Sequence, residues 1–225
     1  MPETTTAIPQ AVLFDLDGTL LDTAPDLVAA VNSLLLEDGR EAVSMDSLRP
    51  WVSQGGLALI GQAYGIPMES DQALALRQRY LVSYKNNISR YSRLFDGLEE
   101  ILWSIESSGR PWGVVTNKPG YLTRKLLLEL GLLDRPSCVV CGDTAKRSKP
   151  WPDPVVLACR NMGISPEHTL MVGDDCRDID SAHSAGADAV AAAWGYIRPD
   201  DDPSSWNAEA VLATPDDLWP WIDGH

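Results

Sequence analysis

The sequence has few cysteines and no long hydrophobic run, and each shortage excludes a class of protein. Four cysteines in 225 residues are too few for a disulfide scaffold and are typical of a reducing compartment. No apolar segment reaches the roughly 18–20 residues that a membrane span needs, and the first residues lack the basic end and apolar centre of a secretory signal. We therefore expect a cytoplasmic protein with no membrane partner.

Basic residues are also scarce. With 18 Lys and Arg residues against 32 Asp and Glu residues, the formal net charge is −14. Such a charge repels phosphate backbones, so we expect no nucleic-acid partner. An acidic protein still binds a small anion where a metal ion and one or two lysines reverse the sign of the charge locally.

Two of the cysteines, Cys138 and Cys141, have the spacing of half a zinc site. No second pair stands at ligand spacing, and the three histidines are remote in the sequence. We therefore interpret these two cysteines as buried residues near a strand.

Short apolar runs, often β-branched and bounded by Gly, Asp, Asn or Pro, predict strands that are buried on both faces of a parallel sheet. Helical patterns lie between them in the segments 98–105, 121–130 and 152–162. This alternation from residue 95 onward predicts a doubly wound α/β core with right-handed crossovers. The predicted strands are Ala11–Phe14, Trp112–Val115, Cys138–Val140, Thr169–Val172 and Ala187–Ala193.

Residues 23–93 break this alternation. Thr23 and Asp26 form a capping-box pattern at the start of a helix that runs to Gly39. Further helical stretches follow at about 55–64 and 71–88, with no convincing strand between them. We interpret the segment as a helical cap domain inserted after the first strand. The expected division is residues 1–22 and 94–225 for the α/β core and residues 23–93 for the cap.

Polar residues follow the predicted strands. Because ligands bind at the carboxyl ends of the strands in an open parallel sheet, we expect these residues to lie together. Each aspartate alone is also explained as a turn or helix-cap residue, but turn chemistry does not predict the combination. Crowded carboxylates repel unless a cation joins them, and hard oxygen ligands favour Mg²⁺. The residues are Asp15, Asp17 and Thr19, then Thr116, Asn117 and Lys118, then Lys149, and finally Asp174, Asp175 and Asp178.

The ordered motifs D-L-D-G-T, T-N, K-P and G-D-D-x-x-D resemble those of the haloacid dehalogenase superfamily of phosphatases. The resemblance spans essentially the whole chain and implies a Rossmann-like core. The helical insertion after the first motif is similar to the phosphoglycolate phosphatase and β-phosphoglucomutase branch, whose cap closes over the substrate. The family also dehalogenates, but Asp17 argues against that reaction, since a halide leaving group needs no acid.

The resemblance implies a role for each matching residue. Asp15 is the expected nucleophile that forms an aspartyl-phosphate, and Asp17 is the expected general acid and base. Thr116 and Asn117 are expected to hold the phosphoryl oxygens, and Lys149 to offset negative charge on the nucleophile and the phosphate.

The resemblance also implies a Mg²⁺ site and a substrate contact at the first motif. The expected ligands are an Asp15 carboxylate oxygen, the Asp17 backbone carbonyl and Asp174. Gly18 is expected to contact the substrate. Asp178 is expected to support Lys149 or a metal-bound water, although a helix N-terminal charge explains it equally well. Asp175 stands where many relatives have a small hydroxyl residue, and its charge either strengthens metal binding or weakens phosphate binding.

Substrate choice is expected to reside in the cap, in the segment 49–56. Its paired glycines would let backbone amides approach a substrate, and Arg49 would meet a carboxylate; a plain interhelix turn is the alternative. We expect 2-phosphoglycolate as the substrate. The alternative is N-acetylmuramic acid 6-phosphate, because the tail WGYIRPDDDPSSW resembles phosphatases of that ester. A phosphomutase and a non-catalytic binding module remain further alternatives. The expected assembly is a monomer or a homodimer.

Overall fold

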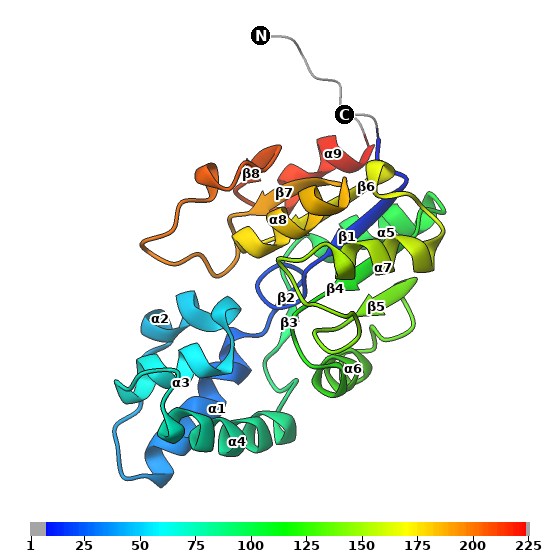
Figure 1. The fold of residues 1–225 in the computed structure, drawn as a ribbon. Coiled ribbons are helices and arrows are strands. Elements are labelled where there is room, and N and C mark those ends of the chain that lie inside the picture. The colour runs from blue at the N-terminus through cyan, green and yellow to red at the C-terminus, as the bar shows by residue number, and fades with distance from the viewer. Residues whose placement is uncertain (1–7, 224–225) are drawn as a thin grey trace.

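The computed structural model describes residues 8–223 and shows a parallel sheet between two layers of helices, with a separate group of helices beside it (Figure 1). The sheet has six strands in the order β5-β4-β1-β6-β7-β8, and every neighbouring pair is parallel. No helix in that range is both long and apolar enough to cross a bilayer. The strands are β1 (Ala11–Phe14), β4 (Trp112–Val115), β5 (Cys138–Val140), β6 (Thr169–Gly173), β7 (Asp188–Ala192) and β8 (Ala210–Leu212).

The doubly wound α/β fold predicted from the sequence is confirmed, and the central strand shows why its residues are all apolar. All four residues of β1 are buried. Because side chains alternate along a strand, Val12 and Phe14 join one hydrophobic cluster and Leu13 joins another on the opposite face. The first face is covered by α5 (Leu98–Ser107), α6 (Gly120–Glu129) and α9 (Trp219–Asp223), and the second by α7 (Asp153–Met162) and α8 (Cys176–Ala185).

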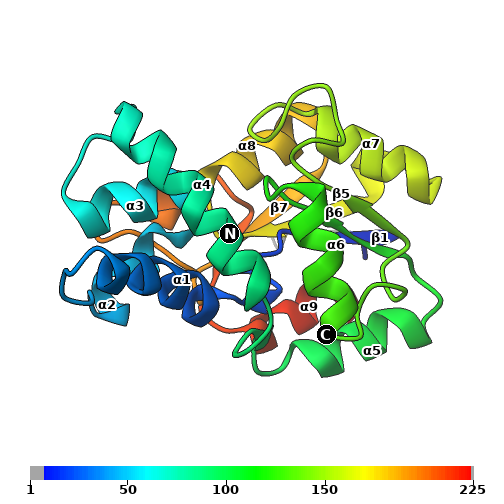
Figure 2. The same ribbon diagram turned by 90° about the horizontal axis from the view of Figure 1, so that it is seen from below.

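The helical insertion after the first strand is present, and it lies apart from the sheet in both views (Figures 1 and 2). Its helices pack on one another, with α1 and α3 both against α4. At its base β2 (Leu21–Asp22) pairs antiparallel with β3 (Arg93–Leu94). The insertion consists of α1 (Ala24–Glu37), α2 (Met45–Leu48), the 3-10 helix η1 (Arg49–Gln54), α3 (Gly56–Tyr64) and α4 (Asp71–Asn86).

The predicted boundaries between core and cap, after residue 22 and before residue 94, remain a prediction. The first seven and last two residues of the expected core lie outside the described part of the chain. The sequence did not predict the β2–β3 pair, β8 or several short helical turns. These turns are η2 (Pro166–His168), η3 (Pro203–Ser205) and η4 (Pro215–Leu218).

The predicted capping box at the start of α1 is wrong. Thr23 occupies the N-cap position, but its hydroxyl donates to Asp17 Oδ1 at 2.6 Å and makes no cap hydrogen bond. Asp26 instead accepts hydrogen bonds from Tyr91 and Ser92, the residues that lead out of the cap. The hydroxyl of Tyr196 accepts from the Thr23 and Ala24 amides at 2.7 and 2.9 Å. Long-range partners therefore replaced the local cap, because they satisfy the same helix N-terminal amides.

Candidate active site

Lys149 joins two aspartates at the carboxyl edge of the sheet. Its Nζ atom lies 2.7 Å from Asp15 Oδ1 and 2.5 Å from Asp178 Oδ1, and it also donates to the Val115 carbonyl. Lys149 is 5% exposed. Burial alone lowers the pKa of a lysine, but the two carboxylates outweigh it and hold the pKa of Lys149 above its ordinary value. The lysine therefore keeps its charge, as the sequence analysis expected of a group that offsets negative charge.

Three buried aspartates converge beside this lysine. One carboxylate oxygen from each of Asp15, Asp174 and Asp178 lies within 4.8 Å of the others. Burial and the neighbouring Asp15 raise the pKa of Asp174 to about 7. Because the Lys149 ammonium group contacts only two of these three carboxylates, negative charge remains in excess, and an all-oxygen site of this kind fits a hard divalent cation. The Asp17 carboxylate, by contrast, points elsewhere.

Asp174 is held from three sides. Its oxygens accept hydrogen bonds from the Thr19 hydroxyl at 2.9 Å, the Ser53 hydroxyl at 2.8 Å and the Tyr196 amide at 2.9 Å. Gly18, which we expected to contact the substrate, packs directly beneath this carboxylate. A Cβ atom at Gly18 would lie 2.2 Å from Asp174 Oδ2, and its φ is +92°. The glycine is thus required for close packing at the cluster, and it lies outside the cavity lining.

Asp17 pairs with Lys118, a residue to which the sequence analysis gave no role. The Lys118 ammonium lies 2.9 and 3.0 Å from the two Asp17 oxygens and also bonds the Tyr84 hydroxyl at 2.9 Å. Tyr84 belongs to α4, so the contact links the cap to the core. The T-N-K order put Lys118 beside two predicted site residues, which was the one signal in the sequence that pointed to it.

Thr116 and Asn117 both line the cavity, as expected, but they differ in what their side chains do. The Thr116 hydroxyl accepts from the Lys118 amide at 3.2 Å. The Asn117 side chain bonds both the amide and the carbonyl of Lys149 at 3.0 Å. Its side-chain amide group therefore braces Lys149, and the expected role of Asn117 in holding phosphoryl oxygens stays a prediction.

Arg49 does not lie where the sequence analysis placed it. Its guanidinium group pairs with Asp22 at 2.9 Å and stacks on the Tyr196 ring at 4.8 Å from the centroid. It lies outside the cavity lining. Asp22 and Tyr196 lie at the junction of cap and core, so Arg49 braces that junction and is not available there for a substrate carboxylate.

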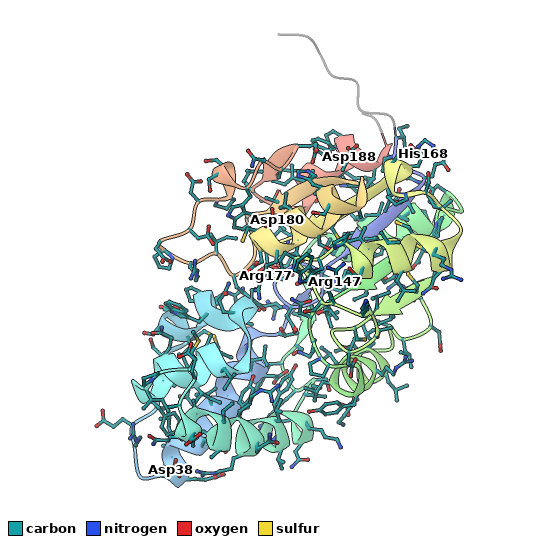
Figure 3. The ribbon with its side chains drawn as sticks, in the orientation of Figure 1. Asp38, Arg147, His168, Arg177, Asp180 and Asp188 are labelled. Atoms are coloured by element: carbon teal, nitrogen blue, oxygen red, sulfur yellow. The ribbon has the colours of Figure 1, made fainter. Side chains whose placement is uncertain are left out.

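The charge of Asp175 is taken up by Arg177. The arginine donates to both carboxylate oxygens at 2.7 and 2.8 Å and to the Ser53 carbonyl at 2.7 Å. Although burial raises the pKa of Asp175, these bonds lower it below its usual value overall. Gln54 of the cap adds a bond to Asp175 at 2.7 Å. Figure 3 labels Arg177 where the core faces the cap.

Side chains of cap and core together line a cavity of about 280 Å³. Acidic and basic side chains line it in equal number, four of each, in a chain whose net charge is −14. This local balance neutralises the negative charge of the chain around the cavity, and a bound metal ion would make the site positive for an anionic ligand. The basic residues are Arg77, Lys118, Lys149 and Arg177, and the acidic residues are Asp15, Asp17, Asp175 and Asp178.

Comparison with known proteins agrees with this geometry. The family described as haloacid dehalogenase-like hydrolase matches residues 12–192. The chain belongs to this family. A Pseudomonas putida relative named N-acetylmuramic acid 6-phosphate phosphatase is 42% identical over 214 residues, which is 95% of this chain and 96% of the relative. A Xanthomonas campestris pv. campestris relative named phosphoglycolate phosphatase is 43% identical over 211 residues, which is 94% of this chain and 95% of the relative.

Solved structures share the fold. A predicted phosphoglycolate phosphatase from Haemophilus somnus superposes with a TM-score of 0.80 at 27% identity, covering 96% of this chain and 97% of that one. A predicted phosphatase from Clostridium acetobutylicum gives 0.80 at 23% identity, covering 97% of this chain and 100% of that one. The chain is therefore a phosphatase of the haloacid dehalogenase-like family, an enzyme class that hydrolyses phosphoric monoesters.

Proposed function

We propose that this phosphatase hydrolyses N-acetylmuramic acid 6-phosphate through an aspartyl-phosphate on Asp15. The single observation that carries the proposal is the cavity between cap and core, which extends from Asp15 and Lys149 to an aromatic and apolar wall on the cap. The larger substrate, which the sequence analysis kept as the alternative, is better supported than 2-phosphoglycolate.

Identity to the relatives does not separate the two substrates, because the two names occur at 42% and 43%. The lining of the cavity supports the larger substrate. Beyond the charged end it includes Leu59, Tyr80 and Leu81. A sugar ring fills such a wall with its apolar faces, whereas 2-phosphoglycolate has one carbon between its two charged groups and leaves the wall without a contact.

In the proposed reaction a carboxylate oxygen of Asp15 attacks phosphorus and the bond to the sugar oxygen breaks. Asp17 gives a proton to the departing alkoxide, then takes one from the water that attacks the aspartyl-phosphate. Lys149 offsets charge on Asp15 and on the phosphoryl group throughout.

The proposed cofactor is Mg²⁺, held by Asp15 and Asp174 with the Asp17 backbone carbonyl. When bound, it neutralises charge on the phosphoryl group during transfer. Asp178 supports Lys149 in this scheme, because their contact is the shorter of the two ion pairs of the lysine.

Substrate competition tests the proposal. Phosphate release should be measured with N-acetylmuramic acid 6-phosphate, 2-phosphoglycolate and glucose phosphates, with Mg²⁺ and with chelator. We expect the highest kcat/KM for the first substrate, and a loss of at least about a thousandfold in Asp15→Asn. A higher kcat/KM for 2-phosphoglycolate would contradict the proposed substrate. An Asp15→Asn variant that stays active would contradict the proposed mechanism.

A phosphomutase is the second candidate, because it uses the same aspartyl-phosphate. The same assay separates it from a phosphatase. An isomerised sugar phosphate with little free phosphate would identify a mutase.

A further inference from the structure

One face of α4 forms a wall of the cavity. Arg77, Tyr80, Leu81 and Tyr84 all line it, and their spacing of three, four and seven residues puts them on one side of the helix. Tyr84 is at the phosphate end, because its hydroxyl bonds Lys118. Seven residues of helix span about 10 Å, so Arg77 is at the far end of this wall.

Arg77 is the cavity cation whose charge is left for a ligand. The other three each pair with an aspartate: Lys118 with Asp17, Lys149 with Asp15, and Arg177 with Asp175. Within residues 8–223, Arg77 has neither an ion pair nor a side-chain hydrogen bond, although it is half-buried and lines the cavity.

Tyr80 supplies a second polar group on the same wall, about one helical turn from Arg77. It is 2% exposed and lines the cavity, and its hydroxyl makes no hydrogen bond to the described residues. Its ring is stacked on Tyr84, with centroids 6.2 Å apart and planes 6° apart, so the hydroxyl is held in a fixed direction. Burial raises the pKa of Tyr80 well above its ordinary value, and the hydroxyl therefore remains a hydrogen-bond donor. Among the described residues, Arg198 Nε is the buried side-chain polar atom without a partner, so the Tyr80 hydroxyl is accessible from the cavity and can bond a ligand there.

The N-terminus of α3 lies against this tyrosine. A Cβ atom at Gly56 would lie 2.7 Å from Tyr80 Cε1, so the glycine lets the ring approach the helix end. Gly55 and Gly56 both line the cavity, and the first amides of a helix have no partner within the helix. A guanidinium group, a phenol and a helix N-terminus all favour an anion.

We propose that Arg77 and Tyr80 form a distal subsite that binds a carboxylate on the organic part of the substrate, at the end of the cavity opposite the phosphate. This inference rests on the proposed function and deepens it. The separation of about 10 Å along α4 requires a phosphomonoester whose carboxylate and phosphate lie on opposite sides of a ring. The two charged groups of 2-phosphoglycolate are too close together to reach both ends.

The test compares two sugar phosphates that differ only in the lactyl ether, which carries the carboxylate. N-acetylmuramic acid 6-phosphate carries a lactyl ether, and N-acetylglucosamine 6-phosphate lacks it. We expect wild-type protein to prefer the first, and Arg77→Gln to lower the ratio of the two kcat/KM values at least about tenfold. The loss should appear mainly in KM, because a contact remote from the reacting atoms is made equally in the ground state and the transition state.

Arg79→Gln is the matched control, because it removes the same charge from the outer side of α4, where Arg79 pairs with Glu37 and Asp38. We expect the ratio of the two kcat/KM values in Arg79→Gln to remain within about twofold of wild type. Tyr80→Phe removes one hydroxyl without changing the packing and should lower the ratio of the two kcat/KM values severalfold.

Arg77→Lys keeps the positive charge, so its ratio should lie between those of wild type and Arg77→Gln. If Arg77→Gln fails to fold, Tyr80→Phe and Arg77→Lys test the subsite in its place.

The two proposals fail in different ways. If Arg77→Gln and Tyr80→Phe both keep the wild-type ratio, or if Arg79→Gln lowers it equally, the subsite is wrong while the substrate assignment stands. If wild type prefers 2-phosphoglycolate but Arg77→Gln still lowers the ratio, the substrate assignment is wrong while the subsite stands. A wild-type protein with no preference for the carboxylate overturns the subsite.

Discussion

The ammonium group of Lys118 lies 2.9 Å from Asp17 Oδ1 and bonds both oxygens of that carboxylate. Lys118 is 9% exposed, so water screens the pair little. The pair joins the proposed acid and base to a residue that also bonds Tyr84 of the cap. The side chain that would protonate the leaving group is therefore oriented by both parts of the molecule.

We expect Lys118→Gln to lower kcat/KM by about 10–100-fold, because it removes both the orientation of Asp17 and one positive charge from the phosphate end. Steady-state kinetics on an aryl phosphate measure the effect. Lys125→Gln is the control, since Lys125 pairs with Glu129 on the outside of α6. Equal activity in the two variants would show that Lys118 has no part in the reaction.

Mg²⁺ should stabilise the protein more at pH 8 than at pH 5.5. Burial and Asp15 raise the pKa of Asp174 from 3.8 to about 7, so between those values the folded metal-free protein keeps a proton that the unfolded chain has lost. Its stability therefore falls as the pH rises through that window. A cation binds the ionised carboxylate and offsets the loss.

The shift in Tm on adding Mg²⁺, measured at both pH values, checks this prediction. Asp174→Asn should show little shift at either pH. A shift in the wild type that is larger at pH 5.5 would contradict the role of the Asp174 carboxylate.

Breaking the Asp175–Arg177 pair should destabilise the protein by about 1–3 kcal/mol in Arg177→Met, because a buried carboxylate loses its main partner. The value lies below that of a fully buried pair because the Arg177 side chain is 31% exposed. Asp175→Ser/Arg177→Met should recover part of the loss, since serine still caps α8. Urea unfolding of the single and double variants gives the coupling energy, and additive losses would disprove the pairing.

Gly56→Ala should lower stability by about 1–3 kcal/mol, although alanine usually favours a helix. The added Cβ would lie 2.7 Å from Cε1 and 3.1 Å from Cδ1 of Tyr80, whose ring is buried and cannot move freely. In a Tyr80→Leu background the same substitution should cost little. Thermal unfolding of the four proteins measures this, and an equal cost in both backgrounds would rule out the clash.

Much of the fold was predictable because its signals are local. The apolar runs at Ala11–Phe14 and Trp112–Val115 are strands with the predicted bounds, since strands buried on both faces need nothing but apolar side chains. Cys138 and Cys141 are buried as predicted. The parallel sheet then brought Asp15, Lys149 and Asp174 to one edge, as the order of the motifs implied.

Partner choice was not predictable from the sequence. Arg49 was assigned to a carboxylate of the substrate, yet Asp22 and Tyr196 occupy its guanidinium group. Thr23 had a suitable local partner in Asp26, but each residue bonds a distant group. No pattern in the sequence predicted a role for Arg77, and only the position of α4 in the structure places this residue in the cavity lining.

The sequence by itself determined the elements, their order and the edge at which the charged residues meet, because hydrophobic periodicity and strand direction act over short stretches of chain. Only the tertiary structure decided which cation serves which carboxylate. Lys118 and Lys149 both lie beside aspartates at the same sheet edge, and distances of a few ångströms assign one to Asp17 and the other to Asp15 and Asp178. Electrostatic pairing depends on such distances and on burial, and neither is encoded in residue spacing.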